Sequence, residues 1–128
     1  MRLVEDVIEL RPGELARASR RAHPNDWYFN GHFPGQPVVP AIVLTELLAQ
    51  TGGLAAAAAS SNEPIAMRVA GFGPFKFPAA AEPGMLLEAT ARVVGRMGKL
   101  VKVEGEVTAD GRSVAVGSVT LAEVAPGE

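Results

Sequence analysis

The stretch PAIVLTELLAQTGGLAAAAAS, residues 40–60, decides the fold. Its side chains are nearly all apolar or small and leave no continuous polar face, which is typical of a helix buried on every side. Pro40 marks the start, because the first amide of a helix is unpaired in any case and proline costs nothing there. The alanine run at 55–59 has the highest intrinsic helix propensity, and Ser60-Ser61-Asn62 follows it. The pattern predicts one long buried helix.

The same stretch is close to the length that spans a bilayer. However, Glu46 and Gln50 lie inside it, together with the pair Gly52-Gly53. A charged residue at the centre of a spanning helix costs roughly 2.5–3.5 kcal/mol, and no basic flank follows the segment. We therefore interpret it as the buried centre of a soluble domain rather than a membrane span.

Strand patterns flank this helix on both sides. Before it, residues 4–10 fit a short amphipathic helix or strand, and residues 15–21 alternate like a strand. After it come four strand candidates, at 65–77, 85–94, 100–108 and 112–124. Asp110-Gly111 between the last two is a strong hairpin signal. One helix with these strands predicts the α+β class, with the helix wrapped by a curved antiparallel sheet in a single domain over residues 1–128.

The composition excludes several functional classes. The 128 residues carry 12 Lys and Arg against 14 Asp and Glu, a net charge of −2 without the basic concentration that nucleic acid binding needs. There is no cysteine, which excludes disulfides, thiol nucleophiles and cysteine–zinc sites. The two histidines, His23 and His32, are too few to favour a histidine-built metal site. Acidic residues at positions 5 and 6 stand where a signal peptide would be apolar, so we expect a cytoplasmic location.

A candidate acid–base pair spans the start of the helix. His32 lies in the loop 31–40, which carries three prolines and two glycines, and Glu46 follows it by fourteen residues. A carboxyl group among apolar helix residues is costly to bury unless it is protonated, partnered or used. An imidazole and a carboxyl group suit the removal and the delivery of a proton.

The segment from His32 to Gln50 resembles the (3R)-hydroxyacyl-acyl carrier protein dehydratase family. The family pattern is His-Phe-Pro-Gly-x-Pro-x-x-Pro-Gly, followed by Glu fourteen residues after the His and then Ala-Gln. The resemblance continues through residues 25–31, 71–78 and 83–84 and the hairpin at 110–111, so it covers nearly the whole chain. It implies a hot-dog fold, in which an antiparallel sheet encloses a long helix. It also implies a homodimer that can assemble further into a hexamer, a trimer of dimers.

The resemblance gives His32 and Glu46 separate roles. His32 would take the C2 proton of a (3R)-3-hydroxyacyl-acyl carrier protein thioester, and Glu46 would protonate or orient the departing hydroxyl. Burial favours the protonated carboxyl that this role needs. The product would be a trans-2-enoyl thioester of fatty-acid or polyketide- or polyene-type biosynthesis. In the family, the two residues of one site come from different protomers.

Two features of the match refine this expectation. Glu rather than Asp at position 46 resembles the dehydratase-only branch, so we expect no double-bond migration. Ala41 stands where the family usually has Gly. Its backbone N–H, at the helix N-terminus, would polarise the thioester carbonyl. Because Ala adds a methyl group there, we expect a shifted substrate pose or a narrower substrate range.

Other residues of the motif would support the pair. Gln50 lies one helical turn after Glu46, where it either orients the carboxyl group or fills a polar gap. Four residues are expected to shape the loop and hold His32 in place: Phe33, Pro34, Gly35 and Pro37.

The remaining candidates have simpler interpretations. Gly52 and Gly53 fit close packing of the helix better than a place beside an acyl tunnel. His23, which precedes a proline, fits a loop residue. Tyr28 and Phe29 fit aromatic residues of the core or of a dimer interface, and less well the lining of an acyl channel.

An acyl carrier protein is usually acidic, so its docking would need a basic rim. Two groups of cations qualify, although ordinary solvated charge explains both equally well: Arg20-Arg21, and Arg92, Arg96, Lys99 and Lys102. Dehydration requires no cofactor and no metal, and the sequence offers no ligand set for one.

Two further functions stay open at this point. In a hot-dog thioesterase, the helix carboxylate would activate water against the thioester, but the intact His-Phe-Pro-Gly loop counts against that reaction. In a non-catalytic hot-dog subunit, the chain would serve only binding or assembly, and Ala41 is the one feature that favours it.

Overall fold

The computed structural model describes residues 2–29, 37–57 and 66–124. In chain order these residues form β1 (Asp6–Arg11), β2 (Leu15–Arg21), the 3-10 helix η1 (Trp27–Phe29), α1 (Ala41–Ala57), β3 (Ala66–Lys76), β4 (Leu86–Met97), β5 (Leu100–Ala109) and β6 (Arg112–Val124). The α+β class and the single long helix are confirmed. The ambiguous segment before the first turn is a strand.

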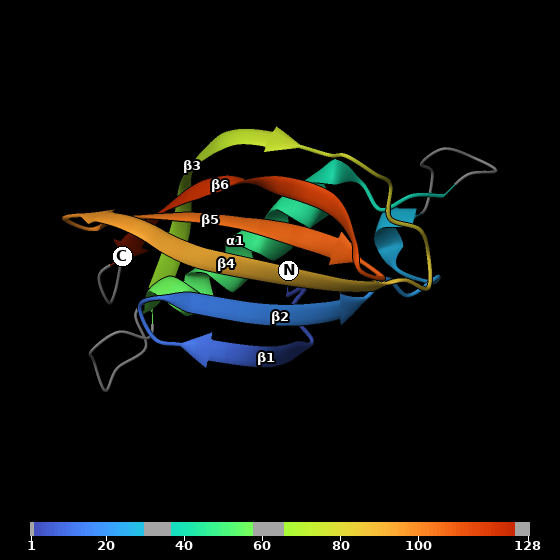
Figure 1. The fold of residues 1–128 in the computed structure, drawn as a ribbon, viewed down its shortest axis with the longest axis horizontal. Helices are drawn as coiled ribbons and strands as arrows, with labels where there is room; N and C mark the ends of the chain where they lie inside the picture. The colour runs from blue at the N-terminus through green and yellow to red at the C-terminus, as the bar shows by residue number, and fades with distance from the viewer. Residues whose placement is uncertain (1, 30–36, 58–65, 125–128) are drawn as a thin grey trace.

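The strands form one antiparallel sheet in the order β1-β2-β4-β5-β6-β3 (Figure 1). Strands β4, β5 and β6 follow one another as a meander, and the hairpin signal at Asp110-Gly111 predicts the turn between the last two. β3 is different, because it precedes the meander in sequence but pairs with β6 at its far side. The chain must therefore cross the sheet between β3 and β4, and local sequence patterns do not reveal this crossing.

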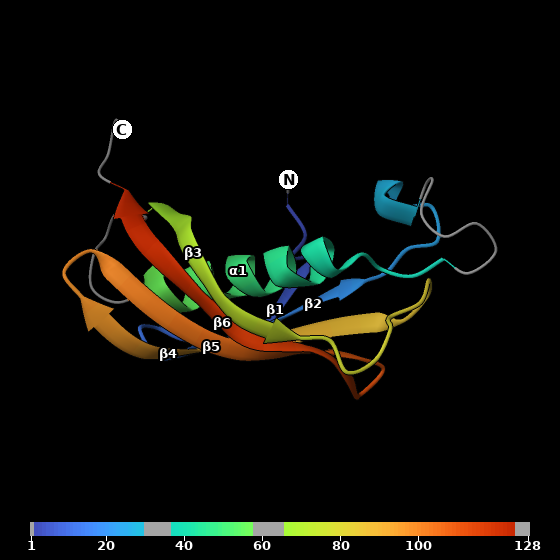
Figure 2. The ribbon, with the colours of Figure 1, turned by 90° about the horizontal axis from the view of Figure 1, so that it is seen from above.

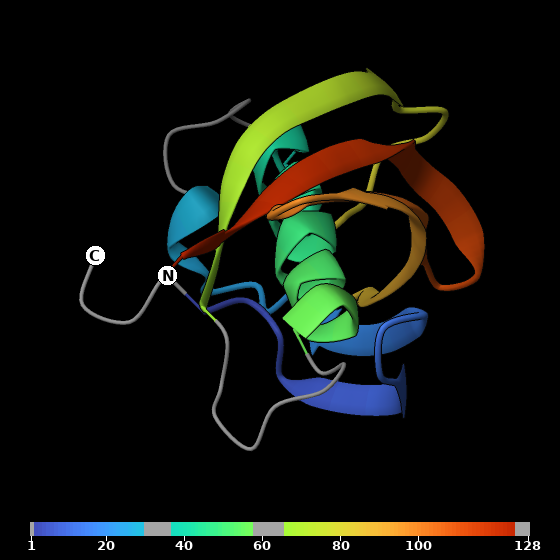
Figure 3. The ribbon, with the colours of Figure 1, turned by 90° about the vertical axis from the view of Figure 1, so that its left-hand side faces the viewer.

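The sheet curls around α1, which lies along its concave side (Figures 2 and 3). Leu47 and Leu48 of α1 are fully buried in the main core, together with Val107 of β5 and Val114 of β6. A second cluster gathers around the later turns of the helix, where Ala49 and Ala56 meet the apolar face of β5 and β6. No helix in the described part of the chain is long and apolar enough to cross a membrane.

Apolar and charged residues alternate along strand β5, and the structure places them on opposite faces of the sheet. Val101, Val103 and Val107 are fully buried against α1. The charged residues between them face outward and are exposed: Lys102, Glu104 and Glu106. Side chains of a strand point alternately to the two faces of a sheet, so one face of β5 is core and the other is surface.

Glycine occurs at the turn between β5 and β6 and at the register shifts of β3. Asp110 and Gly111 both have positive φ, 47° and 86°, as the two central residues of a type I′ hairpin require. In β3 the pairing with β6 shifts register between Val69 and Gly71, and again between Phe72 and Phe75. The two shifts thus fall at Gly71 and at the Gly73-Pro74 step.

Gly52 allows α1 to approach β5 closely. A Cβ atom added at Gly52 would lie 2.7 Å from Cγ2 of Val103, which is shorter than a van der Waals contact. At the neighbouring Gly53, an added Cβ would lie 4.0 Å from Cβ of Met67, an ordinary contact. The packing interpretation favoured from sequence therefore holds at Gly52.

We expect Gly52→Ala to destabilise the protein, since overpacking costs typically about 1–3 kcal/mol and the gain in helix propensity offsets at most about 1 kcal/mol. Gly53→Ala is the matched control. It makes the same change in the same helix without the contact, so it should stabilise by up to about 1 kcal/mol. Urea unfolding of both variants beside the wild type measures the two effects. Equal shifts of the two unfolding midpoints would contradict the close approach.

Candidate active site

The described residues contain half of the expected site. Glu46, Gln50, Ala41 and Pro37 are described, the first three on α1 and the last just before it. The other expected loop residues lie outside the described part of the chain: His32, Phe33, Pro34 and Gly35. The distance between His32 and Glu46 therefore stays a prediction.

Glu46 and Gln50 contact each other along α1. They lie four residues apart on consecutive turns, and Nε2 of Gln50 donates a hydrogen bond to Oε1 of Glu46 at 3.1 Å. Both side chains are half-buried beside the fully buried Leu47. Within the described residues, Oε2 of Glu46 makes no hydrogen bond. Glu46 therefore has one oxygen held by a neutral donor and one oxygen left for other partners.

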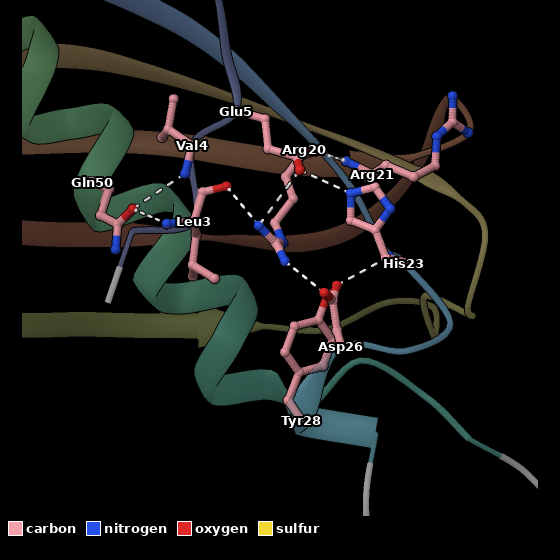
Figure 4. Close-up of polar contacts among 9 residues, drawn as sticks. All are labelled: Leu3, Val4, Glu5, Arg20, Arg21, His23, Asp26, Tyr28 and Gln50. Carbon is pink, nitrogen blue, oxygen red and sulfur yellow. Dashed lines mark hydrogen bonds and ion pairs between the residues drawn. The ribbon is translucent and has the colours of Figure 1, made fainter.

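Gln50 is itself held by the backbone of the N-terminal segment (Figure 4). The amides of Leu3 and Val4 both donate to Oε1 of Gln50, at 2.7 and 3.3 Å. These contacts join residues nearly fifty positions apart. Sequence alone does not predict these contacts, because every residue type except proline carries a backbone N–H donor.

A nearly buried ion pair lies in the segment that leads to the loop of His32. Nη2 of Arg20 is 2.9 Å from Oδ1 of Asp26, and only 12% and 13% of the two side chains are exposed. Asp26 accepts two more hydrogen bonds on Oδ2, from the hydroxyl of the buried Tyr28 at 2.6 Å and from the amide of His23 at 3.0 Å (Figure 4). The carboxylate of Asp26 thus ties β2 to η1, just before residue 30.

The pKa values of this network fix its protonation. Burial alone would raise the pKa of the Asp26 carboxyl, but the hydrogen bonds from Tyr28 and Arg20 outweigh it and lower the pKa from its ordinary value. Burial and the hydrogen bond to Asp26 raise the pKa of Tyr28 to about 12. At neutral pH Asp26 is therefore ionised, and the hydroxyl of Tyr28 keeps its proton and donates a hydrogen bond to it.

This network corrects one candidate of the sequence analysis. Arg20 cannot belong to a basic rim, because its guanidinium is engaged by Asp26 and by the carbonyl of Leu3. Arg21 is exposed and donates to the carbonyl of Gly84 at 2.9 Å. His23 lies in a loop, as expected, with Nε2 2.8 Å from Oε2 of Glu5.

The other candidate rim is partly neutralised. Arg92 and Lys102 line an open hollow on the outer face of the sheet, but Glu104 and Glu106 line it as well. Arg96 donates to the carbonyl of Ala56 at 3.0 Å, which draws its guanidinium toward the end of α1. The charge on this face is therefore mixed rather than basic.

The start of α1 borders an apolar groove. The carbonyl of Pro40 accepts from the amides of Val43 and Leu44, which begins the helix. The amide of Ala41 makes no hydrogen bond with the described residues, and Ala41 is exposed. A groove of about 310 Å³ runs beside it, lined by Val38, Val39, Ala41, Leu44, Phe77 and Ala79–Ala81. A free N–H at a helix N-terminus next to an apolar groove suits a polar carbonyl that carries an aliphatic chain.

No group of three or more potential metal-ligating side chains (His, Cys, Asp or Glu) occurs among the residues that the structure describes. The described groups near the start of α1 are the carboxyl group of Glu46, its partner Gln50 and the backbone N–H of Ala41.

Two sequence relatives and a family model connect the chain with dehydratases. Residues 1–118 match the family model of the FabA-like domain. The 3-hydroxyacyl-[acyl-carrier-protein] dehydratase FabZ of Streptococcus sanguinis (strain SK36) is 36% identical over 122 residues, which cover 95% of this chain and 86% of that protein. The protein of the same name from Streptococcus thermophilus (strain ATCC BAA-491 / LMD-9) is 36% identical with the same coverage.

Solved structures share the fold at lower identity. The dehydratase heterocomplex ApeI:P from Xenorhabdus doucetiae has a TM-score of 0.77 and 18% identity, covering 98% of this chain and 85% of that one. The E. coli PaaI protein from the phenylacetic acid degradation operon has a TM-score of 0.75 and 18% identity, covering 94% and 79%. At these identities the likeness establishes the fold alone, and it confirms the expected hot-dog fold.

Proposed function

The chain belongs to the FabA-like family, and from this membership we propose that it removes water from a 3-hydroxyacyl-[acyl-carrier-protein] thioester in fatty-acid biosynthesis. The observation that carries the proposal is the 36% identity to FabZ dehydratases over 95% of the chain. The substrate is the (3R)-3-hydroxyacyl form and the product the trans-2-enoyl thioester. We expect the reaction to take place in the cytoplasm.

The proposed site uses two proton transfers. His32 takes the C2 proton, the electrons of that C–H bond form the C2=C3 double bond, and the C3–O bond breaks. Glu46 gives its proton to the departing hydroxyl, which leaves as water. The elimination of water needs no external oxidant or reductant, so general acid–base catalysis is sufficient. The hydrogen bond from Gln50 to Glu46 supports this role, because it fixes the direction of the carboxyl group.

The start of α1 supplies the third element of the proposal. Removal of the C2 proton places negative charge on the thioester oxygen, and the N–H of Ala41 is proposed to stabilise it. The groove beside Ala41 is proposed to take the acyl chain next to the carbonyl. The methyl group of Ala41 narrows this entrance relative to Gly, which supports the expectation of a restricted substrate range.

We further propose a homodimer with shared sites, in which His32 of one protomer serves Glu46 of the other. Strand β3 supports this, because it ends the sheet order and has an unpaired edge. Large apolar side chains are exposed near it: Phe72 on the strand at 54% and Phe77 just after it at 44%. Ile42 in the first turn of α1 is 75% exposed. An apolar edge strand is a template for pairing with a second chain.

A single assay separates the dehydratase from its competitors. The protein is incubated with a 3-hydroxyacyl thioester of an acyl carrier protein, and enoyl formation and free thiol are followed together. We expect enoyl product without thiol release. Thiol release alone would replace the proposal with a thioesterase, and no change in either channel would favour a non-catalytic subunit.

A further inference from the structure

A short N-terminal strap, Leu3–Glu5, crosses beside α1 before β1 begins (Figure 4). The side chain of Leu3 is only 1% exposed and that of Val4 only 9%, so the strap is packed into the core. Its two amides at Leu3 and Val4 converge on Oε1 of Gln50, at 2.7 and 3.3 Å. The strap therefore binds the helix through a residue that also contacts Glu46.

The two amides fix which way the Gln50 side chain faces. The oxygen and nitrogen ends of a glutamine amide have nearly the same shape, so only their hydrogen bonds distinguish them. If the amide turned over, its NH2 group would face two N–H donors and both bonds would be lost. With Oε1 on the strap, Nε2 must face Glu46, which it does at 3.1 Å.

This direction matters for the protonated carboxyl group of Glu46 that the proposed reaction uses. Oε1 of Glu46 accepts a hydrogen from Nε2 of Gln50, so a proton on Oε1 pointing along the same line would meet another hydrogen. A protonated carboxyl has one O–H donor and one accepting oxygen. The proton is accordingly favoured on Oε2, the oxygen that makes no hydrogen bond with the described residues.

The strap is held by β2 independently of α1. The carbonyl of Leu3 accepts from Nη1 of Arg20 at 3.3 Å, and the amide of Glu5 donates to the carbonyl of Ser19 at 2.9 Å. Oε1 of Glu5 also accepts from the amide of Arg21 at 2.8 Å. Because none of these contacts involves position 50, the amides of Leu3 and Val4 form a preset pair of donors for the Gln50 oxygen.

We propose that the strap is a positioning element of the dehydration, which selects Oε2 of Glu46 as the oxygen that delivers the proton by fixing Gln50 through the amides of Leu3 and Val4. Gln50 and Leu3 are positioning residues in this account, because they act through Glu46. The proposal rests on the proposed role of Glu46 as the general acid.

The test compares two variants of one residue. Leu3→Pro and Leu3→Ala both truncate the buried side chain, but only proline removes the N–H that Gln50 accepts. We expect kcat of Leu3→Pro to be about three- to tenfold below that of Leu3→Ala, with the same KM, since the net value of one such hydrogen bond is about 0.5–1.5 kcal/mol. Equal kcat values in two folded variants would overturn the proposal.

A double-mutant cycle and an exchange measurement complete the test. With Gln50→Met added, the difference between Leu3→Pro and Leu3→Ala should vanish, because the acceptor is gone. Amide hydrogen exchange at Leu3 and Val4 should be faster in Gln50→Met than in the wild type, and this readout does not require Leu3→Pro to fold. Unchanged exchange, or a difference that survives Gln50→Met, would overturn the strap alone. Loss of the proposed function would appear separately, as a wild type that forms no enoyl product.

Discussion

We expect Glu46→Gln to lower the kcat of dehydration by about 10²–10⁴-fold, since a positioned general acid contributes about that factor. Glutamine keeps the size of the side chain and can still bond with Gln50, but it has no proton of suitable acidity to give to the departing hydroxyl. KM should change little, because the substrate contacts proposed at Ala41 and the apolar groove are retained. Steady-state kinetics with the carrier-protein thioester measures both constants.

Glu88→Gln is the matched control for this change. Glu88 lies on β4 and pairs with Arg17 at 3.2 Å, with 33% and 40% of the two side chains exposed. Removing such an exposed pair costs at most about 1 kcal/mol of stability and should leave kcat unchanged. A wild-type kcat in Glu46→Gln would remove Glu46 from the mechanism, while equal losses in both variants would point to a general effect of charge.

The same variant tests whether the sites are shared. His32→Ala is expected to be as inactive as Glu46→Gln when each is assayed alone. If His32 and Glu46 of one site come from two protomers, mixed dimers contain one intact site. Refolding the two variants together at equal amounts should restore about one quarter of the wild-type activity. No restoration would place both residues of a site on one chain.

Asp26→Ala is expected to cost about 3 kcal/mol of unfolding free energy, because it leaves the guanidinium of Arg20 nearly buried without its carboxylate. Tyr28 loses the acceptor of its hydroxyl in the same step. Asp6→Asn, at the exposed start of β1, is the control and should stay within about 0.5 kcal/mol of the wild type. Urea unfolding at neutral pH measures both. A loss below 1 kcal/mol in Asp26→Ala would show that the pair contributes no more than a surface pair.

Acid should weaken the same interaction. The pKa of Asp26 in the folded protein lies below its ordinary value. At acidic pH the carboxyl group of Asp26 therefore binds fewer protons in the folded protein than in the unfolded protein. Its contribution to stability is therefore complete above the pKa of an unfolded aspartate and is lost as the pH falls through the folded pKa. Unfolding free energy should fall more steeply with acid in the wild type than in Asp26→Asn. Parallel curves would contradict the lowered pKa.

Much of the fold follows from local sequence patterns. The buried helix, the strand at 15–21, the alternation of β5 and the turn at Asp110 all depend on neighbours within a few residues, and each is present as expected. The pairing of β3 with β6 depends instead on residues about fifty positions apart, which no local period encodes. The register shifts of β3 fall at Gly71 and at Gly73-Pro74, residue types that weaken a regular strand without fixing how its partner pairs.

In the candidate site, too, the contacts between neighbours in sequence can be predicted and the contacts between distant segments cannot. Glu46 and Gln50 share a helix face by spacing alone, so their contact could be anticipated. The strap on Gln50 could not, because its donors are backbone amides. The ion pair of Arg20 and Asp26 joins two charged residues of a kind that sequence alone assigns to the surface. In the structure both side chains are nearly buried, beside the buried Tyr28.

The place of β3 in the sheet also has a meaning for the time course of synthesis. On a growing chain, residues 66–76 are made well before residues 112–124, the strand with which they pair. Until then the ring of Phe75 lacks Gly117 of β6, against which it packs in the folded protein. Pairings between distant segments form slowly. The sheet therefore cannot close until β6 has been translated, and β3 waits unpaired while the intervening strands are made.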